Sequence, residues 1–144
     1  MLLAALGRDA EAISSLEDDE ARGPSVAVDI CQGARFAIQE RREEGRVIVQ
    51  RLAALPTFID PEALFHLAEV AARLGEHDAA MAALSRSLDG YCGLPALEID
   101  PWLDSLRGRS DFRRLLDRAE IQRRAALDTF IVAGGERLLG VTVR

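Results

Sequence analysis

Two amphipathic stretches on either side of one glycine constrain the fold of this chain most strongly. The first begins at Asp60-Pro61, where a carboxylate that can cap a helix precedes a proline suited to the first helical position. Apolar residues then recur at the three- and four-residue spacing of one buried helical stripe: Leu64, Leu67, Ala68, Ala71 and Leu74. Gly75 predicts the end of this helix.

A second helix is predicted directly after Glu76-His77-Asp78, and Gly90 closes it. Its apolar face consists of Ala80, Met81, Leu84, Ser87 and Leu88. Two helices of similar length joined by so short a turn pack antiparallel. Only 5% of the residues are aromatic, and alanine, leucine, glutamate and arginine dominate. This composition favours an all-α fold.

The sequence pattern of the turn between these helices recurs near the N-terminus. Residues 74–80 and 6–12 both read L-G-x-x-x-x-A, 68 residues apart, which is two units of 34. A third turn is therefore expected near residue 41, where Gln39 to Glu44 is a polar break. Gly45 takes the place of the alanine there, and no turn glycine is present.

A helix-turn-helix period of 34 with this pattern resembles the tetratricopeptide repeat. The last unit matches the family through Leu64, Leu67, Ala68, Ala80, Leu84 and Leu88, and departs from it at Ala71 and Ser87. The middle unit matches through Gly33, Phe36, Gly45, Val49, Leu52 and Ala53, and the first through Gly7, Ala12 and Leu16. The resemblance implies a right-handed superhelix of antiparallel hairpins at about 1–22, 25–56 and 60–92.

The residues after the third unit, 93–107 with Asp111-Phe112, are similar to the segment that closes repeat regions in multidomain bacterial signalling proteins. Asp100-Pro101 predicts the start of a short helix that carries Trp102, Leu103 and Leu106. Ser110 is a candidate N-cap for a long helix that Gly134-Gly135 stops. Residues 93–144 are therefore expected to cap the same domain, because a helical stack must cover its last apolar face.

The first hairpin looks incomplete. Met1 to Leu6 supplies less than half of a first helix, which would leave Leu2, Leu3, Ile13 and Leu16 exposed. We expect either that the chain is a fragment or accessory part of a larger bacterial protein, or that this hairpin pairs with a second copy in a homodimer.

Charge and residue types exclude several kinds of chemistry. All 18 basic residues are arginine, and lysine and asparagine are absent. The chain therefore has no lysine for a Schiff base or a P-loop, and no asparagine for a Cys-His-Asn triad. Codon bias of a GC-rich genome explains this best. The net charge of −6 arises entirely from residues 1–72, and so acidic a chain is not expected to bind nucleic acid.

The sequence contains only weak candidates for a catalytic, metal or cofactor site. His66 and Glu69 form an i, i+3 pair, but only Glu62 could join them as a further ligand, so no metal and no cofactor are expected. Neither G-x-S-x-G nor G-x-G-x-x-G occurs. The two cysteines, Cys31 and Cys92, suit a reducing cytoplasm. No apolar run approaches 18 residues, so no membrane span is expected.

A protein-binding groove is the remaining candidate, and it depends on the resemblance. In that family, ligand peptides lie along the first helix of each repeat. This position corresponds here to Ala27, Ile30, Ala34, Ala37 and Ile38, and to Glu62, Phe65, Glu69, Ala72 and Arg73. We therefore expect a non-enzymatic module that binds a peptide or a partner helix. Two alternatives stay open: these residues only pack within a short stack, or a small-molecule pocket exists for which the sequence offers no polar constellation.

Overall fold

The computed structural model describes residues 1–21, 23–56, 59–90 and 93–142, and all regular elements in these ranges are helical. The expectation of an all-α fold is therefore confirmed. The elements are α1 (Leu2–Ala5), α2 (Asp9–Glu20), α3 (Val26–Ile38), α4 (Arg42–Ala53), α5 (Pro61–Leu74), α6 (His77–Ser87), α7 (Leu94–Ile99), the 3₁₀ helix η1 (Pro101–Leu106), α8 (Ser110–Val132) and α9 (Gly135–Leu139). Cys92 lies outside the described residues.

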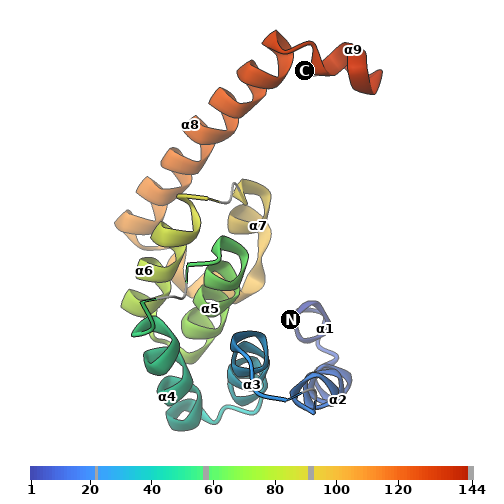
Figure 1. Ribbon diagram of the computed structural model, residues 1–144. Helices are drawn as coiled ribbons and strands as arrows, with labels where there is room; N and C mark the ends of the chain where they lie inside the picture. Colours follow the sequence, from blue (N-terminus) through green and yellow to red (C-terminus); the bar gives the residue numbers. More distant parts are fainter. Residues whose placement is uncertain (22, 57–58, 91–92, 143–144) are drawn as a thin grey trace.

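The hairpin predicted around Gly75 is the centre of the fold. The N–H of Ala63 donates to Oδ1 of Asp60 at 2.8 Å, which satisfies one free amide of the first turn of α5. α5 ends at Leu74, and Gly75 adopts φ 83°, a left-handed conformation that glycine tolerates without strain. α6 then packs along α5 (Figure 1).

The same turn recurs three times along the chain. Gly7, Glu40 and Gly75 all have positive φ, and the residue after each donates its N–H to the carbonyl five positions earlier. This is the hydrogen bonding of a Schellman motif. Glu40 lies 33 residues after Gly7 and 35 before Gly75. The period read from the sequence is thus present in the backbone, and Glu40 takes the place of the missing turn glycine.

A small buried residue follows each of these turns by five positions. Ala12 is 3% exposed, Ala80 is fully buried, and Gly45 occupies the same place in the middle unit. A Cβ at Gly45 would lie 2.7 Å from Cδ1 of Leu74, so the glycine allows α4 to approach α5 closely. The residues four positions further on are all buried, namely Leu16, Val49 and Leu84.

The segment after α6 contributes buried residues to the apolar core. The Asp100 side chain caps η1 by accepting from the N–H of Trp102 at 2.8 Å, and Trp102, Leu103 and Leu106 are buried. The hydroxyl of Ser105 donates to the carbonyl of Ala72 at 3.2 Å, which attaches η1 to α5. One detail differs: Ser110 is the first residue of α8, and Arg109 holds the cap position.

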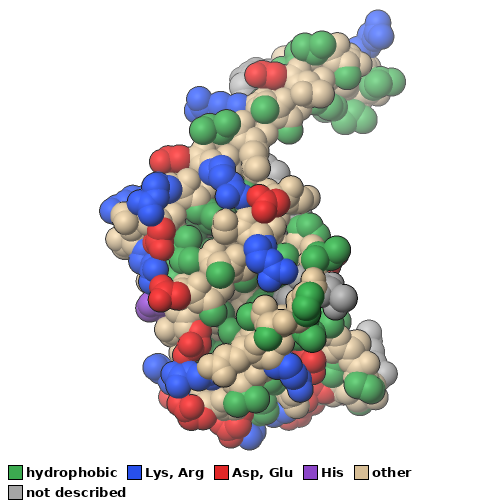
Figure 2. Space-filling model, turned by 60° about the vertical axis from the view of Figure 1, so that its left-hand side comes forward, with side chains coloured by type: hydrophobic (Ala, Val, Ile, Leu, Met, Phe, Trp, Pro, Cys, Tyr) green, Lys and Arg blue, Asp and Glu red, His purple; other side chains and the backbone are tan. Residues whose placement is uncertain are grey.

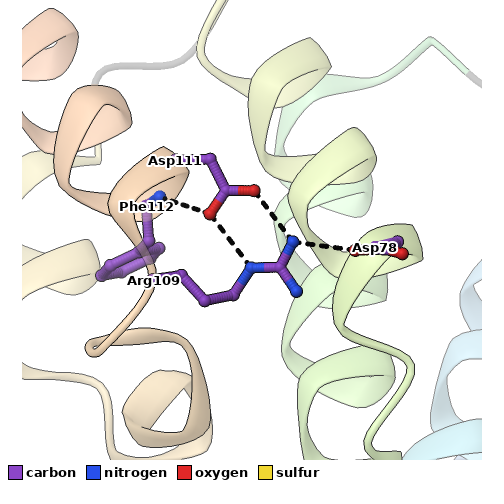
Figure 3. A network of polar contacts seen from close by, with 4 residues as sticks. All are labelled: Asp78, Arg109, Asp111 and Phe112. Atoms are coloured by element: carbon purple, nitrogen blue, oxygen red, sulfur yellow. Dashed lines mark hydrogen bonds and ion pairs between the residues drawn. The ribbon is translucent and has the colours of Figure 1, made fainter.

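The start of α8 is attached to α6 by a network of charged groups (Figure 3). Arg109 binds both oxygens of Asp111, at 3.0 and 2.9 Å, and reaches Asp78 of α6 at 2.8 Å. The same Asp111 side chain accepts from the N–H of Phe112, which the expected Ser110 cap would otherwise have to satisfy. The Arg109 guanidinium lowers the pKa of Asp111 to about 2.

The second half of α8 leaves the body of the molecule. Its buried residues are Phe112, Leu115 and Ala119, all in the first half. From Glu120 onward the helix projects with α9 at its far end (Figure 1), and hydrophobic side chains are exposed along it (Figure 2). We call residues 120–139 the α8 arm. No helix in the described ranges combines the length and the apolar character needed to cross a bilayer.

Candidate functional site

One large groove of about 1140 Å³ opens between the first hairpin and the C-terminal cap. α3 and α5 form its floor, since Ala27, Ile30, Ala34 and Ala63 all line it. α1 and α2 form one wall, and α7 with η1 forms the other. The ribbons of α1 and α7 lie apart from each other (Figure 1), and residues of both helices line the groove. Helices distant in sequence thus build a single surface.

Five of the expected groove residues line this surface. They are Ala27, Ile30 and Ala34 of α3, and Glu62 and Glu69 of α5. Their spacing places them on one side of each helix. Ile30 and Ala34 are nevertheless buried, 6% and 1% exposed, because α2 and α5 pack against α3.

The other five expected residues lie elsewhere, and Phe65 corrects the prediction most clearly. Phe65 is 6% exposed and lies outside the groove, beside Leu84, Leu88 and Leu97. Its placement in the core means that substitution would damage folding rather than a surface.

Ile38 and Arg73 also lie outside the groove. Ile38 packs against the core. Arg73 lies at the end of α5 with its guanidinium 5.9 Å from the centre of the Trp102 ring. Ala37 and Ala72, the neighbours of these residues in the expected inner face, are also buried in the core.

Several residues that line the groove are not among those expected there from the sequence. Trp102, Ile99 and Pro101 come from the cap, which the sequence predicts only as a cover for the core. The side chains of α1 were expected to remain exposed, yet Leu3 lines the groove, and Leu16 of α2 is 8% exposed. No local pattern could place α1 opposite the cap, because that contact depends on how all the helices stack.

A polar cluster lies within this apolar groove. Nδ1 of His66 is 2.6 Å from Oε2 of Glu69, one turn further along α5. Glu69 is 4% exposed, whereas the His66 side chain is 40% exposed. Asp100, at the corner between α7 and η1, lies beside Glu69. The corner is held by Arg107, whose Nη2 donates to the Asp100 carbonyl at 3.0 Å.

Burial dominates the electrostatics of this cluster. The pKa of Glu69 is raised to about 7, mainly by burial; the hydrogen bond to His66 opposes this rise, and the neighbouring Asp100 carboxyl adds to it. Glu69 in turn raises the pKa of His66 by accepting its hydrogen bond. The pair therefore holds a proton near neutral pH and can exchange hydrogen-bond roles with a bound group.

The charged residues that line the groove are mostly acidic. They are Asp19, Asp60, Glu62, Glu69 and Asp100. His66 is the one side chain among the described lining residues that can carry positive charge, and the α-amino group of Met1, which also lines the groove, acts against the rise of the His66 pKa. Such a surface favours a ligand with apolar area and a cationic group. In the described part of the chain, no group of three or more histidine, cysteine, aspartate or glutamate side chains is placed to hold a metal ion.

The arginines of α8 form the most basic segment of the chain, and they are largely engaged with acids. Arg123 and Arg124 bind Glu120, and Arg118 reaches Asp89 at 2.8 Å and the carbonyl of Ser85 at 2.9 Å. These contacts are the local pairing that the sequence spacing favours.

Comparison with known proteins adds no relative to this description: no family model, no curated protein and no solved structure matches the chain significantly.

Proposed function

We propose that this chain is a protein-interaction module whose groove binds an apolar segment of a partner, without catalysis. The observation that carries the proposal is the groove of about 1140 Å³ between the first hairpin and the cap, with a predominantly apolar lining. Apolar clefts of this kind commonly receive the apolar face of a helix or peptide.

The recurring turns support a tetratricopeptide-like hairpin stack as its architecture. Three helix pairs close with the same hydrogen-bond pattern near residues 7, 40 and 75. Each is followed five residues later by a buried small side chain or glycine. Stacked hairpins present a continuous surface that single helices do not, and this is how repeat proteins bind extended partners.

The lining also favours one kind of partner segment. Apolar side chains cover most of the surface, while the ionisable side chains are carboxylates and His66. An amphipathic helix with an arginine or lysine beside its apolar face would match both features. We place this interaction in a reducing cytoplasm, where a thiol such as that of Cys31 at the groove stays reduced.

A displayed library of helical peptides tests the proposal. Ala27 and Ala63 line the groove and are not fully buried, so Ala27→Glu and Ala63→Glu would block it with little effect on folding. Ala53→Glu is the matched control, because Ala53 is exposed on α4 outside the groove. Selected peptides should be amphipathic and basic, and should bind wild type and the control at least tenfold more tightly than either groove variant (roughly 1.4 kcal/mol).

Equal affinity for wild type and for both groove variants would contradict the proposal. Circular dichroism of each variant shows whether a lost interaction reflects a blocked groove or an unfolded chain.

The alternative function, a homodimer through the first hairpin, keeps one supporting observation. Leu2 and Leu6 are 74% and 64% exposed at the edge of the groove. Leu6→Asp should then convert a dimer into a monomer in sedimentation velocity. A wild-type protein whose mass is unaffected by this substitution would exclude that interface.

A further inference from the structure

A regular face on the α8 arm is exposed and has no packing partner among the described residues. Along one side of the helix lie Ile121, Arg124, Ala125, Asp128, Ile131 and Val132. Their three- and four-residue spacing is that of one helical face, which we call the arm face. The exposed fractions of its larger apolar members are 68% for Ile121, 40% for Ile131 and 88% for Val132.

The opposite side of the arm is already occupied. Phe130 lies half a turn away from the arm face and packs against Gly135, where a Cβ would overlap the phenylalanine ring. α9 therefore folds back on that side (Figure 1) and leaves the arm face exposed. A projecting helix of about four turns is marginal in water unless an apolar face is covered.

The arm face is complementary to itself in an antiparallel arrangement. If two copies cross with a two-fold axis at Ala126, Ile121 of each lies opposite Ile131 of the other. In the same register Arg124 lies opposite Asp128, twice by symmetry. In an antiparallel pair of helices related by a two-fold axis, each residue lies opposite the residue at the same distance on the other side of the axis. The small side chain of Ala125 permits the two helices to approach closely near the axis.

We propose that the arm face is a dimerisation surface whose occupant is the same face of a second copy, antiparallel about Ala126. Apolar contacts at both ends supply the association, and the two Arg124–Asp128 pairs set the register and direction. The proposal does not rest on the proposed function, because the groove lies on the body and the arm face projects from it.

The charges favour a second copy over an unrelated helix. Arg124 is 71% exposed and binds Glu120 on its own helix, so it can turn toward an added carboxylate at little cost. Described residues 120–139 contain three arginines and three acids. The arm therefore carries no net charge that would repel a copy of itself. The interface is small, so a dissociation constant on the order of 10–100 μM is expected.

Reversing the charge at residue 124 or at residue 128 tests the register of the antiparallel pair. Sedimentation velocity of wild type should show the 15.7 kDa chain associating into dimers as its concentration rises to about 1 mM. Arg124→Glu places two carboxylates opposite each other at both symmetric positions, and Asp128→Arg places two guanidinium groups there. Each variant alone should dimerise at least tenfold more weakly than wild type.

Mixing the two single variants is the decisive measurement. In a mixed pair, the glutamate introduced at 124 faces the arginine introduced at 128, and the native Asp128 of one copy faces the native Arg124 of the other. Equimolar Arg124→Glu and Asp128→Arg should therefore form a heterodimer with an affinity near that of wild type. A change in the helicity of either chain cannot produce this rescue.

Matched controls separate the register from net charge. Arg42→Glu and Asp18→Arg make the same charge changes at exposed positions on α4 and α2, and should leave association unchanged. The proposal is overturned by a wild-type protein that stays monomeric at about 1 mM, by single variants that dimerise like wild type, or by a mixture that remains monomeric. Loss of association in Leu6→Asp instead would assign the dimer to the first hairpin.

Discussion

Nδ1 of His66 lies 2.6 Å from Oε2 of Glu69, and this contact joins a half-exposed imidazole to a buried carboxyl on the same face of α5. Glu69 is 4% exposed within a groove lined mainly by apolar side chains. Water cannot stabilise its negative charge there, so the carboxyl keeps its proton to an unusually high pH. The folded state therefore depends on pH through this pair.

The stability of the protein should fall as pH rises from 5 to 8. In the unfolded chain Glu69 loses its proton near the ordinary glutamate pKa of 4.5, whereas in the fold its pKa is about 7. Between these values the native state binds more protons, so the free energy of unfolding decreases, by up to about 3 kcal/mol in all. The raised pKa of His66 acts in the same direction above the ordinary histidine value of 6.5.

Urea unfolding at pH 5 and pH 8 measures this difference. Glu69→Gln should remove most of it, because the amide keeps the hydrogen bond to His66 but does not titrate. Glu43→Gln, at an exposed position on α4, should retain the wild-type dependence. A Glu69→Gln variant with the full wild-type difference would exclude Glu69 as its source.

The three recurring turns predict opposite effects for two substitutions. Glu40 adopts φ 58°, which a side chain with a Cβ disfavours, so Glu40→Gly should stabilise the protein by roughly 0.5–1 kcal/mol. Gly75→Ala should destabilise it by about 1–2 kcal/mol for the same reason, even though the space around Gly75 is open. Thermal unfolding of both variants checks the sign, and two changes of the same sign would contradict the shared turn geometry.

An ion pair attaches the first hairpin to the second. Arg35 of α3 binds both oxygens of Glu20 at the end of α2, at 2.7 and 3.0 Å, and the two side chains are only 14% and 18% exposed. Glu20→Gln should cost about 1–3 kcal/mol, because it leaves a poorly hydrated guanidinium with a weaker partner.

The exposed pair of Arg8 and Glu11 is the control for this prediction. Its side chains are 51% and 59% exposed, so water and salt screen the interaction. Glu11→Gln should leave the midpoint of denaturant unfolding unchanged. A Glu20→Gln variant as stable as Glu11→Gln would show that the first hairpin is held by apolar contacts alone.

Phe112 anchors the start of α8 in the core. It is fully buried, and its removal leaves a cavity that the surrounding helices cannot fill. Phe112→Ala should therefore cost about 3–5 kcal/mol, measured by chemical unfolding. Leu138→Ala, at a residue that is 79% exposed in α9, should change stability by less than about 0.5 kcal/mol.

Local features of the chain were predicted well from sequence. The cap at Asp60, the stop at Gly75 and the capped short helix at Asp100 all occur where expected. These features depend on residues a few positions apart, and the physical preferences of aspartate, proline and glycine act at that range. The period of the turns was also correct, although the sequence contains no signal that singles out Glu40 as the residue with positive φ.

The groove was predicted only in part. The resemblance to the tetratricopeptide repeat assigned Ala27, Ile30, Ala34, Glu62 and Glu69 to an inner face, and these residues line the groove. It could not show that Phe65 packs toward Leu84 and Leu88, because that depends on the side of α5 against which α6 and α7 lie. The i, i+3 spacing of His66 and Glu69 was also visible, but their burial was not.

Apart from the short helices α7 and α9, the sequence by itself determined which segments are helical, where they turn, and that the turns repeat. These properties follow from side-chain chemistry acting over one or two helical turns. Tertiary structure alone decided that α1 lies opposite the cap, that Asp100 approaches Glu69, and that half of α8 projects from the body. Each of these depends on how helices far apart in the chain pack together. That packing cannot be read from the residues of any one helix.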